Sequence, residues 1–165
     1  MQVDIGFSDL VYPRPVPISY PCILNMLPPQ LIGYTPESMI AEKTHTMVVL
    51  GELNSRIKDY FDIWFLSRQF EFDGQGLLDA IAKTFTNREV DVELLGAATV
   101  FSTDFKYDQT KNAQWQSFIS KNELGVAPVL FEEAMKDIAV FIFPVIDAFK
   151  TGTTFARHWN KITWV

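Results

Sequence analysis

The sequence predicts an α+β fold in which a small N-terminal sheet of two or three strands precedes a helix-dominated bundle. Near the start of the chain, apolar residues alternate with polar ones, which is the two-residue period of a β-strand. From residue 35 onward, apolar residues recur at three- and four-residue spacing behind helix-capping residues. With 165 residues, 48% of them hydrophobic, the chain can bury one core. We therefore expect a single domain over 1–165, strand-rich over 1–34 and helical over 35–165.

Strands are expected at 3–7 and 16–20, where apolar residues alternate, and at 30–34 after a pair of prolines. The prolines at 13, 15 and 17 cannot donate to a β-ladder, so most of this region is expected at the edge of a sheet. The chain is already in a strand at its third residue, and a domain rarely begins so abruptly. We therefore expect it to be the C-terminal part of a larger protein.

Capping residues predict where the helices begin. Thr35, Pro36 and Glu37 combine a hydroxyl cap, a preset first position and an acid at the positive end of the dipole, and Gly51 is expected to end this helix after Leu50. Further helices are expected from Asn54 or Ser55 to about Gln69, over 77–86 behind a turn at 73–76, over 113–119 behind a polar loop at 103–112, and over 131–149 with a kink at Pro144. Residues 90–94 alternate as in a short strand or extended link, although 89–98 equally suits the start of a helix. Near the end of the chain, Trp159 and Trp164 are expected to cap the core, or to form an interface if exposed.

Charge and composition limit the classes of function. Acidic residues outnumber basic ones by 20 to 14, and the net charge of −6 disfavours a protein that binds nucleic acid over its whole surface. A local basic pocket for a nucleotide is compatible with this charge. The longest apolar run, 138–146, has about half of the roughly 20 residues that a membrane helix needs, so no membrane association is expected. Cys22 is the single cysteine and is expected in the core; without a disulfide or a signal segment, the cytoplasm is the expected compartment. His45 and His158 lack companion ligands, so no zinc site is expected.

The densest cluster of functional side chains lies at 41–43 and 54–62. On a helix, Asp59 and Asp62 share a face and Lys58 lies four residues before Asp62, so these side chains can pair. Arg56 and Lys58 stand at a helix start, where the dipole and the free N–H groups add to their charge, so this corner is suited to receive phosphate. A solvated helix start with ordinary i,i+3 and i,i+4 pairs fits the same spacing.

Asp4 is the other candidate, because it lies in an alternating strand whose apolar residues face the opposite side. It fits the wet face of a half-buried sheet. It equally fits a convergent set of carboxylates that binds a hard cation such as Mg²⁺ together with substrate phosphates. The second interpretation requires partner ligands elsewhere in the fold.

Three ordered motifs in the chain resemble one known family. They are V-D-I-G-F at 3–7, Y-T-P-E leading to I-A-E-K over 34–43, and S-R-I-K-D-Y-F-D-I-W at 55–64. The AbiEii/AbiGii nucleotidyltransferases show an equivalent strand aspartate, a proline–glutamate helix with Ala-Glu-Lys, and an Arg-x-Lys-Asp-x-x-Asp helix in the same order. The resemblance covers residues 3–72 well and continues weakly beyond. It implies a fold that resembles the C-terminal part of a polymerase β-like nucleotidyltransferase.

The resemblance implies a bacterial toxin of a toxin–antitoxin or phage-abortive-infection system that transfers a nucleotide from an NTP to an RNA or protein acceptor. In such enzymes a Gly-Ser turn, an Asp-x-Asp strand and a third strand carboxylate hold two magnesium ions, which position the triphosphate. Carried over by position, the resemblance implies that the catalytic residues are Asp4, Lys43, Lys58, Asp59 and Asp62. Arg56, Lys43 and Lys58 would bind the triphosphate or the acceptor, and Asp59 and Asp62 would orient these cations. Asp4 would bind the metal.

The sequence departs from the family pattern at one point. No Gly-Ser followed by Asp-x-Asp precedes Asp4, and the similar string at 91–93 comes after the helices, in the wrong order. One aspartate does not hold two magnesium ions, so we expect the active site of this chain to be incomplete. The alternative is a catalytically inactive remnant that binds a partner, an antitoxin or a second copy of the chain, through an exposed sheet edge. An unrelated α+β binding domain is a third hypothesis.

Overall fold

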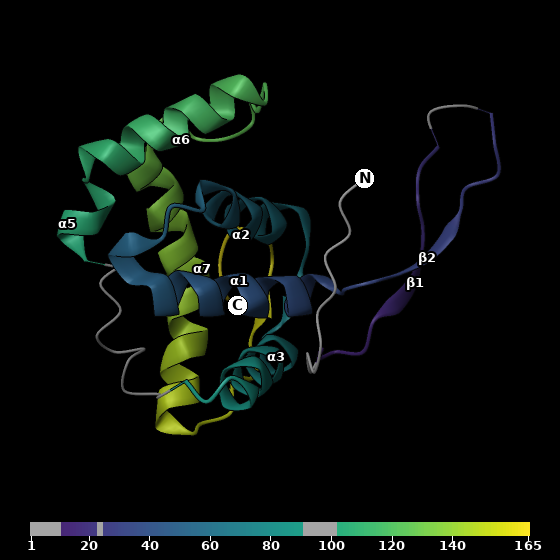
Figure 1. Ribbon diagram of the computed structural model, residues 1–165. Helices are drawn as coiled ribbons and strands as arrows, with labels where there is room; N and C mark the ends of the chain where they lie inside the picture. Colours follow the sequence, from purple (N-terminus) through teal and green to yellow (C-terminus); the bar gives the residue numbers. More distant parts are fainter. Residues whose placement is uncertain (1–10, 23–24, 91–101) are drawn as a thin grey trace.

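The computed structural model describes residues 11–22, 25–90 and 102–165 (Figure 1). The predicted α+β class is confirmed, because a two-stranded antiparallel sheet is followed by a mainly helical body. The elements are β1 (Val16–Ser19), β2 (Gln30–Gly33), α1 (Pro36–Leu50), η1 (Gly51–Leu53), α2 (Ile57–Gln69), β3 (Phe72–Asp73), α3 (Gly74–Asn87), α5 (Thr103–Lys106), α6 (Gln109–Lys121), α7 (Phe131–Thr151) and β4 (His158–Trp159). The predicted strand at 3–7, with Asp4, lies outside the described residues, as do residues 91–101.

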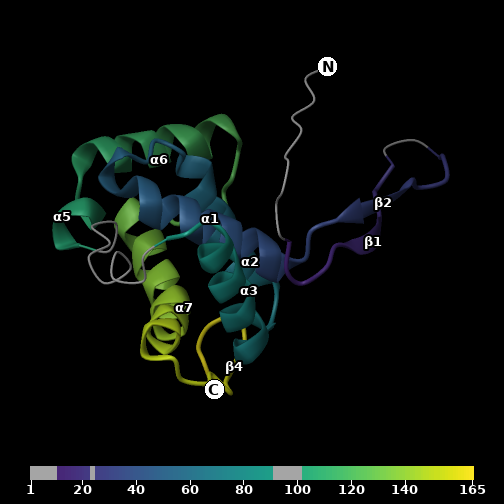
Figure 2. The same ribbon diagram turned by 60° about the horizontal axis from the view of Figure 1, so that its bottom comes forward.

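The strands β1 and β2 form an arm that projects from the helical body (Figures 1 and 2). The two strands predicted at 16–20 and 30–34 are confirmed, and Val16 pairs with Gly33 at the base of the arm. Apolar side chains of the arm, including Ile18 and Ile32, are exposed. Cys22 follows β1 and is exposed as well, so the prediction that it lies in the core is wrong. The reason is that Cys22 follows β1 in the arm, whose described residues are mostly exposed and are not covered by the helices.

The core lies between α1, α2, α3 and α7. Helix α1 packs against both α2 and α3, and α7 packs against the same two helices. Each helix contributes fully buried apolar residues, among them Ile40, Ile63, Ile81 and Phe141. Helix α1 has the predicted bounds: the hydroxyl of Thr35 accepts from the backbone N–H of Ser38, and the helix ends before Gly51, which has a φ of 53°. Local capping therefore fixes the helix that carries Lys43.

Some observed helices begin or end at other residues than predicted, and capping side chains explain this for α3, α5 and α6. Helix α3 begins at Gly74, three residues earlier than predicted, because the Asp73 carboxylate accepts from the N–H of Gly76. The predicted polar loop at 103–112 is wrong: Ser102 caps the short helix α5 and Asp108 caps α6, which begins at Gln109. Helix α2 begins at Ile57, two or three residues later than predicted. Helix α7 continues through Pro144 to Thr151.

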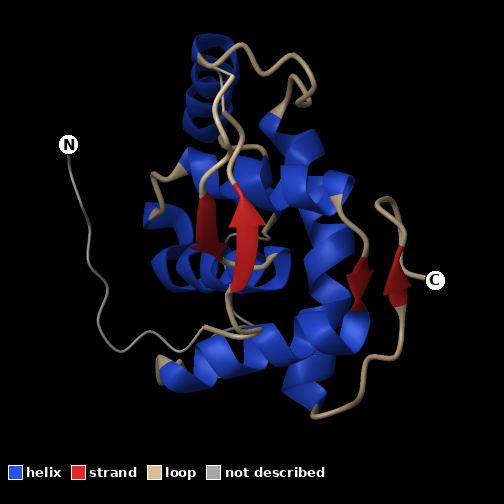
Figure 3. Ribbon diagram, turned by 90° about the vertical axis from the view of Figure 1, so that its right-hand side faces the viewer, coloured by secondary structure: helices blue, strands red, loops and turns tan. Residues whose placement is uncertain are grey.

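The C-terminal residues return to the helical body. Strand β4 pairs with β3 across 85 or more residues of sequence, and Figure 3 shows the two short strands side by side near the C-terminus. Trp159 donates its indole N–H to the carbonyl oxygen of Ser67 at 2.7 Å, and Trp164 donates to that of Phe141 at 2.9 Å. Both tryptophans are buried, which confirms that they cap the core. Within the described residues, no helix is long and apolar enough to cross a membrane.

Candidate functional site

Four of the predicted site residues meet where α1 and α2 pack together. The ammonium of Lys43 on α1 lies 2.9 Å from Asp59 Oδ1 and 2.6 Å from Asp62 Oδ2, both on α2. The ammonium of Lys58, one turn before Asp62, lies 2.5 Å from the same Oδ2 atom. One carboxylate oxygen therefore holds lysines from two helices. We call Lys43, Lys58, Asp59 and Asp62 the acid–lysine cluster.

The members of the acid–lysine cluster differ in exposure. The side chains of Lys43, Asp59 and Asp62 are 14–18% exposed, whereas that of Lys58 is 68% exposed. The pair of Lys58 and Asp62 is the ordinary i,i+4 contact that the spacing allows. The contacts of Lys43 instead join two helices in a mostly buried position, so a solvated helix face describes only part of the cluster. Lys58 is the member placed to meet a ligand from solvent.

The pKa of Lys43 reflects two opposing effects. Burial acts to lower the pKa of its ammonium, but hydrogen bonds and charge from Asp62 and Asp59 outweigh burial and raise the pKa above the usual 10.5. Lys43 is therefore charged throughout the physiological pH range. With two lysines and two aspartates the cluster is neutral, so the carboxylates present no net negative charge to an approaching anion.

Arg56 stands at the start of α2, beside the cluster. Its side chain is exposed, and no side chain caps α2 by a hydrogen bond. The start of α2 therefore combines the positive end of a helix dipole with Arg56 and Lys58. A groove of about 720 Å³ lies between the start of α2 and α6, and it is lined by Ser55, Ile57 and residues of α6 that include Lys121. This arrangement is suited to an anionic ligand.

Three other residues near the start of α2, Asn54, Tyr60 and Lys111, were not predicted as site residues from the sequence. The ammonium of Lys111 on α6 donates to the backbone carbonyl oxygen of Asn54 at 2.6 Å, and both residues are buried. The hydroxyl of Tyr60 is fully buried beside the Asn54 amide, and burial raises its pKa. Lys111 and Asn54 are 57 residues apart, so no local spacing indicates their contact.

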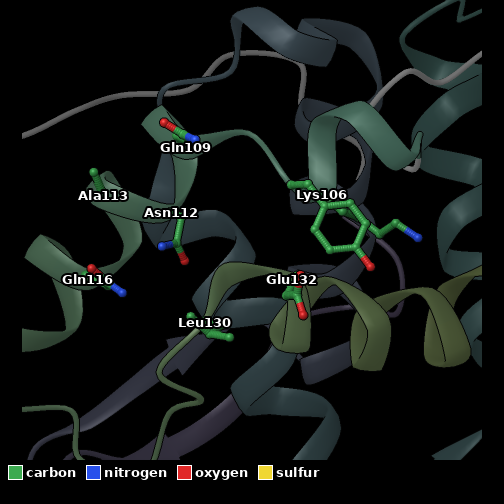
Figure 4. A pocket seen from close by; sticks show the side chains of 8 residues that line it. Lys106, Gln109, Asn112, Ala113, Gln116, Leu130 and Glu132 are labelled. Atoms are coloured by element: carbon green, nitrogen blue, oxygen red, sulfur yellow. The ribbon is translucent and has the colours of Figure 1, made fainter.

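A smaller cavity of about 220 Å³ lies elsewhere, between α5, α6 and the start of α7 (Figure 4). Lys106, Asn112 and Glu132 are among its lining residues. None of the predicted site residues lines it, so it is separate from the acid–lysine cluster.

Metal binding has no support among the described residues, because these contain no group of three or more His, Cys, Asp or Glu side chains that could hold an ion. One oxygen of Asp59 and one oxygen of Asp62 are engaged by lysines, whose positive charge opposes the binding of a magnesium ion between these carboxylates. Asp4, the predicted metal ligand, and the acidic string at 91–93 lie outside the described residues. From the sequence we also expect Asp4 to face Lys43 and Asp59 across one cleft, and this stays a prediction.

Most of the chain matches a known protein family. Residues 1–139 match the family model described as nucleotidyl transferase AbiEii toxin, type IV toxin–antitoxin system. The match spans the acid–lysine cluster, the start of α2 and the first part of α7. Comparisons with curated proteins and with solved structures give no match.

Proposed function

The chain belongs to the AbiEii family of nucleotidyl transferase toxins from type IV toxin–antitoxin systems, and on this premise we propose that it serves NTP-dependent transfer of a nucleotide to an RNA or protein acceptor. Family membership implies a cognate antitoxin. In this proposal the start of α2 binds the triphosphate, and the acid–lysine cluster positions the cations that do so. The proposal includes an NTP as the nucleotide donor, RNA or protein as the acceptor, and the cytoplasm as the location.

The observation that carries the proposal is the sharing of Asp62 by Lys43 and Lys58. A phosphate that draws the exposed Lys58 away from Asp62 would leave a bare carboxylate beside the anion if Asp62 had no other partner. Lys43 remains bound to Asp62 and Asp59, so the two carboxylates keep one net negative charge instead of two. The cluster thus allows Lys58 and Arg56 to contact phosphate while Lys43 offsets part of the negative charge of the two carboxylates.

Each site residue has a distinct role in this scheme. Lys58 and Arg56 bind the phosphates from solvent, since both side chains are exposed. Asp59 and Asp62 hold Lys43, whose ammonium keeps one further donor for the triphosphate or acceptor. A magnesium ion bound by Asp4 and the phosphates would polarise the triphosphate. That part rests on the family resemblance alone, and we derive no step through the metal.

The test measures toxicity and nucleotide transfer by the protein expressed from its natural reading frame in a bacterial host. Lys58→Met and Arg56→Met should each lower incorporation of labelled nucleotide into RNA or protein by about tenfold or more, the loss expected from one charge-assisted phosphate contact. Both variants should relieve growth arrest at equal protein level. Lys150→Met is the control, because Lys150 is an exposed lysine at the end of α7 and its loss changes the net charge equally.

The outcomes separate the proposal from its alternative. Loss of transfer in both site variants, with the control intact, supports a triphosphate site at the start of α2. Toxicity without transfer of any of the four NTPs would favour a domain that binds a partner and performs no chemistry. Wild-type activity in both site variants would remove Arg56 and Lys58 from the site.

A further inference from the structure

Lys111 is a buried cation directly beneath the candidate site. Its residue is only 9% exposed, and its ammonium donates to the carbonyl oxygen of Asn54 at 2.6 Å. The ring of Phe105 lies 5.5 Å from the ammonium. Burial of an ammonium is unfavourable unless the charge is well bound, and an apolar residue of similar length would fill the same space at lower free energy. The position of this charge therefore requires an explanation.

Asn54 connects Lys111 to the start of α2. Its carbonyl oxygen accepts from Lys111, and its side-chain Oδ1 accepts from the backbone N–H of Arg56 at 2.8 Å. The residue is fully buried, and its Nδ2 has no hydrogen-bond partner. No side chain caps α2, and the two hydrogen bonds of Asn54 add to the backbone bonds from Asn54 N–H to Gly51 and from Ile57 N–H to Ser55 in holding the chain that enters this helix. Arg56 is thereby fixed at a defined place relative to α6.

Helix α6 is itself firmly held. The Asp108 carboxylate caps it by accepting from the N–H of Lys111 at 2.7 Å. The side chain of Asn112 accepts from the N–H of Phe131, the first residue of α7, at 3.1 Å. Trp115 is fully buried and donates to the carbonyl oxygen of Pro128 at 2.8 Å. Lys111 therefore projects from a helix that is anchored to α7. Its hydrogen bond to Asn54 starts from a part of the fold that is itself held in place.

We propose that Lys111 is a positioning residue that acts through Asn54 to fix the start of α2, and with it Arg56 and Lys58, in the geometry that binds phosphate. This inference rests on the proposed triphosphate site. The hydrogen bond is charge-assisted and shielded from water, so it is strong enough to select one position of the chain at 54–56. Without it the chain at 54–56 loses its hydrogen bond to α6, while Phe61 of α2 still packs against Trp115 and Phe118 of α6.

Two measurements on the full chain test this role with Lys111→Met, and Lys150→Met serves as the control. The first is hydrogen exchange of the Arg56 amide, read by NMR, which reports directly on its hydrogen bond to Asn54. The second is the affinity for inorganic tripolyphosphate with Mg²⁺, measured by calorimetry at a temperature where both variants are fully folded. For Lys111→Met we expect exchange about tenfold faster and affinity about tenfold weaker, the effect of losing one charge-assisted hydrogen bond. Amides in α3 should exchange as in the wild type.

The results distinguish failure of this inference from failure of the proposed function. Unchanged Arg56 exchange or unchanged affinity in Lys111→Met, with a wild type that binds tripolyphosphate, overturns the positioning role alone. A wild type that does not bind the probe overturns the triphosphate site and this inference with it. A variant with a lower melting temperature but wild-type exchange and affinity when folded shows a merely structural lysine, which also overturns it.

A third measurement needs only the wild type, in case Lys111→Met fails to fold. If Lys111 ties the start of α2 to α6, the Arg56 amide exchanges through the same opening reaction as the amides of α6. The free energies of opening of the two sets then coincide over a denaturant series. Exchange of Arg56 by local fraying, independent of denaturant, overturns the proposal.

Discussion

Removal of the Lys43 ammonium should destabilise the protein far more than removal of the Lys58 ammonium. Lys43 contacts Asp59 and Asp62, and all three side chains are 14–18% exposed. An exposed pair contributes about 0.2–1 kcal/mol, and breaking a buried pair costs about 3–5 kcal/mol. In Lys43→Met, Asp62 keeps Lys58, but Asp59 has no other ion pair within the described residues. We therefore expect a loss of about 2–3 kcal/mol in the free energy of unfolding.

Lys58→Met is the matched comparison, because it removes the same group from the same carboxylate at an exposed position. Lys58 is 68% exposed, so its loss should change the free energy of unfolding by less than about 0.5 kcal/mol. Urea unfolding of both variants, with the midpoint and the m-value fitted together, measures the difference. Equal losses in the two variants would show that water screens Lys43 as it screens Lys58, and would refute the account of the buried cluster.

The pH dependence of the same variant provides an independent check. The pKa of Lys43 is raised above 10.5 in the folded protein, where bonds to Asp62 and Asp59 outweigh burial. Protonation of Lys43 therefore contributes stability that is complete below pH 10.5 and is lost as the pH rises through the higher folded pKa. Wild-type stability should fall more steeply than that of Lys43→Met above pH 10.5. Parallel curves would show that the ammonium is not bound as the structure indicates.

Two further predictions concern Gly74 of α3 and His45 of α1. Gly74→Ala should lower the free energy of unfolding by about 2 kcal/mol, because the new Cβ would lie 2.6 Å from the carbonyl oxygen of Phe155. The control is Gly76→Ala, whose Cβ would meet nothing closer than 3.3 Å, and equal shifts of the urea midpoint would contradict tight packing of the C-terminal residues on α3. Burial of His45, together with the positive charge of Arg88, lowers the pKa of its imidazole below 6.5 in the folded protein. Below pH 6.5 the unfolded chain therefore binds a proton at His45 more readily than the folded protein does. The free energy of unfolding should consequently fall as the pH drops below 6.5. His45→Gln should flatten this part of the curve measured by thermal unfolding, and an unchanged slope would show that other groups cause it.

Features of the chain that depend on neighbouring residues were predictable from sequence. Thr35 and Gly51 act within one turn of the helix ends, so the bounds of α1 followed from capping rules alone. The contact of Lys58 with Asp62 likewise follows from four-residue spacing. For the same reason, the cluster of motifs at 41–43 and 54–62 was recognisable before the structure placed its members together.

Features that depend on distant parts of the chain were not predictable. The pairing of β3 with β4 joins Phe72 to Trp159, and a ladder of two residues is too short to be predicted from the periodicity of apolar residues. The late start of α2 depends on Asn54, whose carbonyl is held by Lys111 from another helix. Cys22 was placed wrongly because an apolar run predicts burial only when the fold brings other elements to cover it. In each case the deciding interaction is tertiary.

The acid–lysine cluster explains how a chain of net charge −6 can still present an anion site. Asp59 and Asp62 would repel phosphate if they were free, but Lys43 and Lys58 neutralise them within hydrogen-bond distance. Among the described residues no acidic side chain forms a salt bridge with Arg56, which adds one positive charge at the positive end of the α2 dipole. At physiological ionic strength, charges beyond about 8 Å are largely screened, so acidic residues farther away than this weaken the local attraction little. Binding at such a site depends on where the few charges stand, which is why the position of the α2 start matters more than the total charge of the protein.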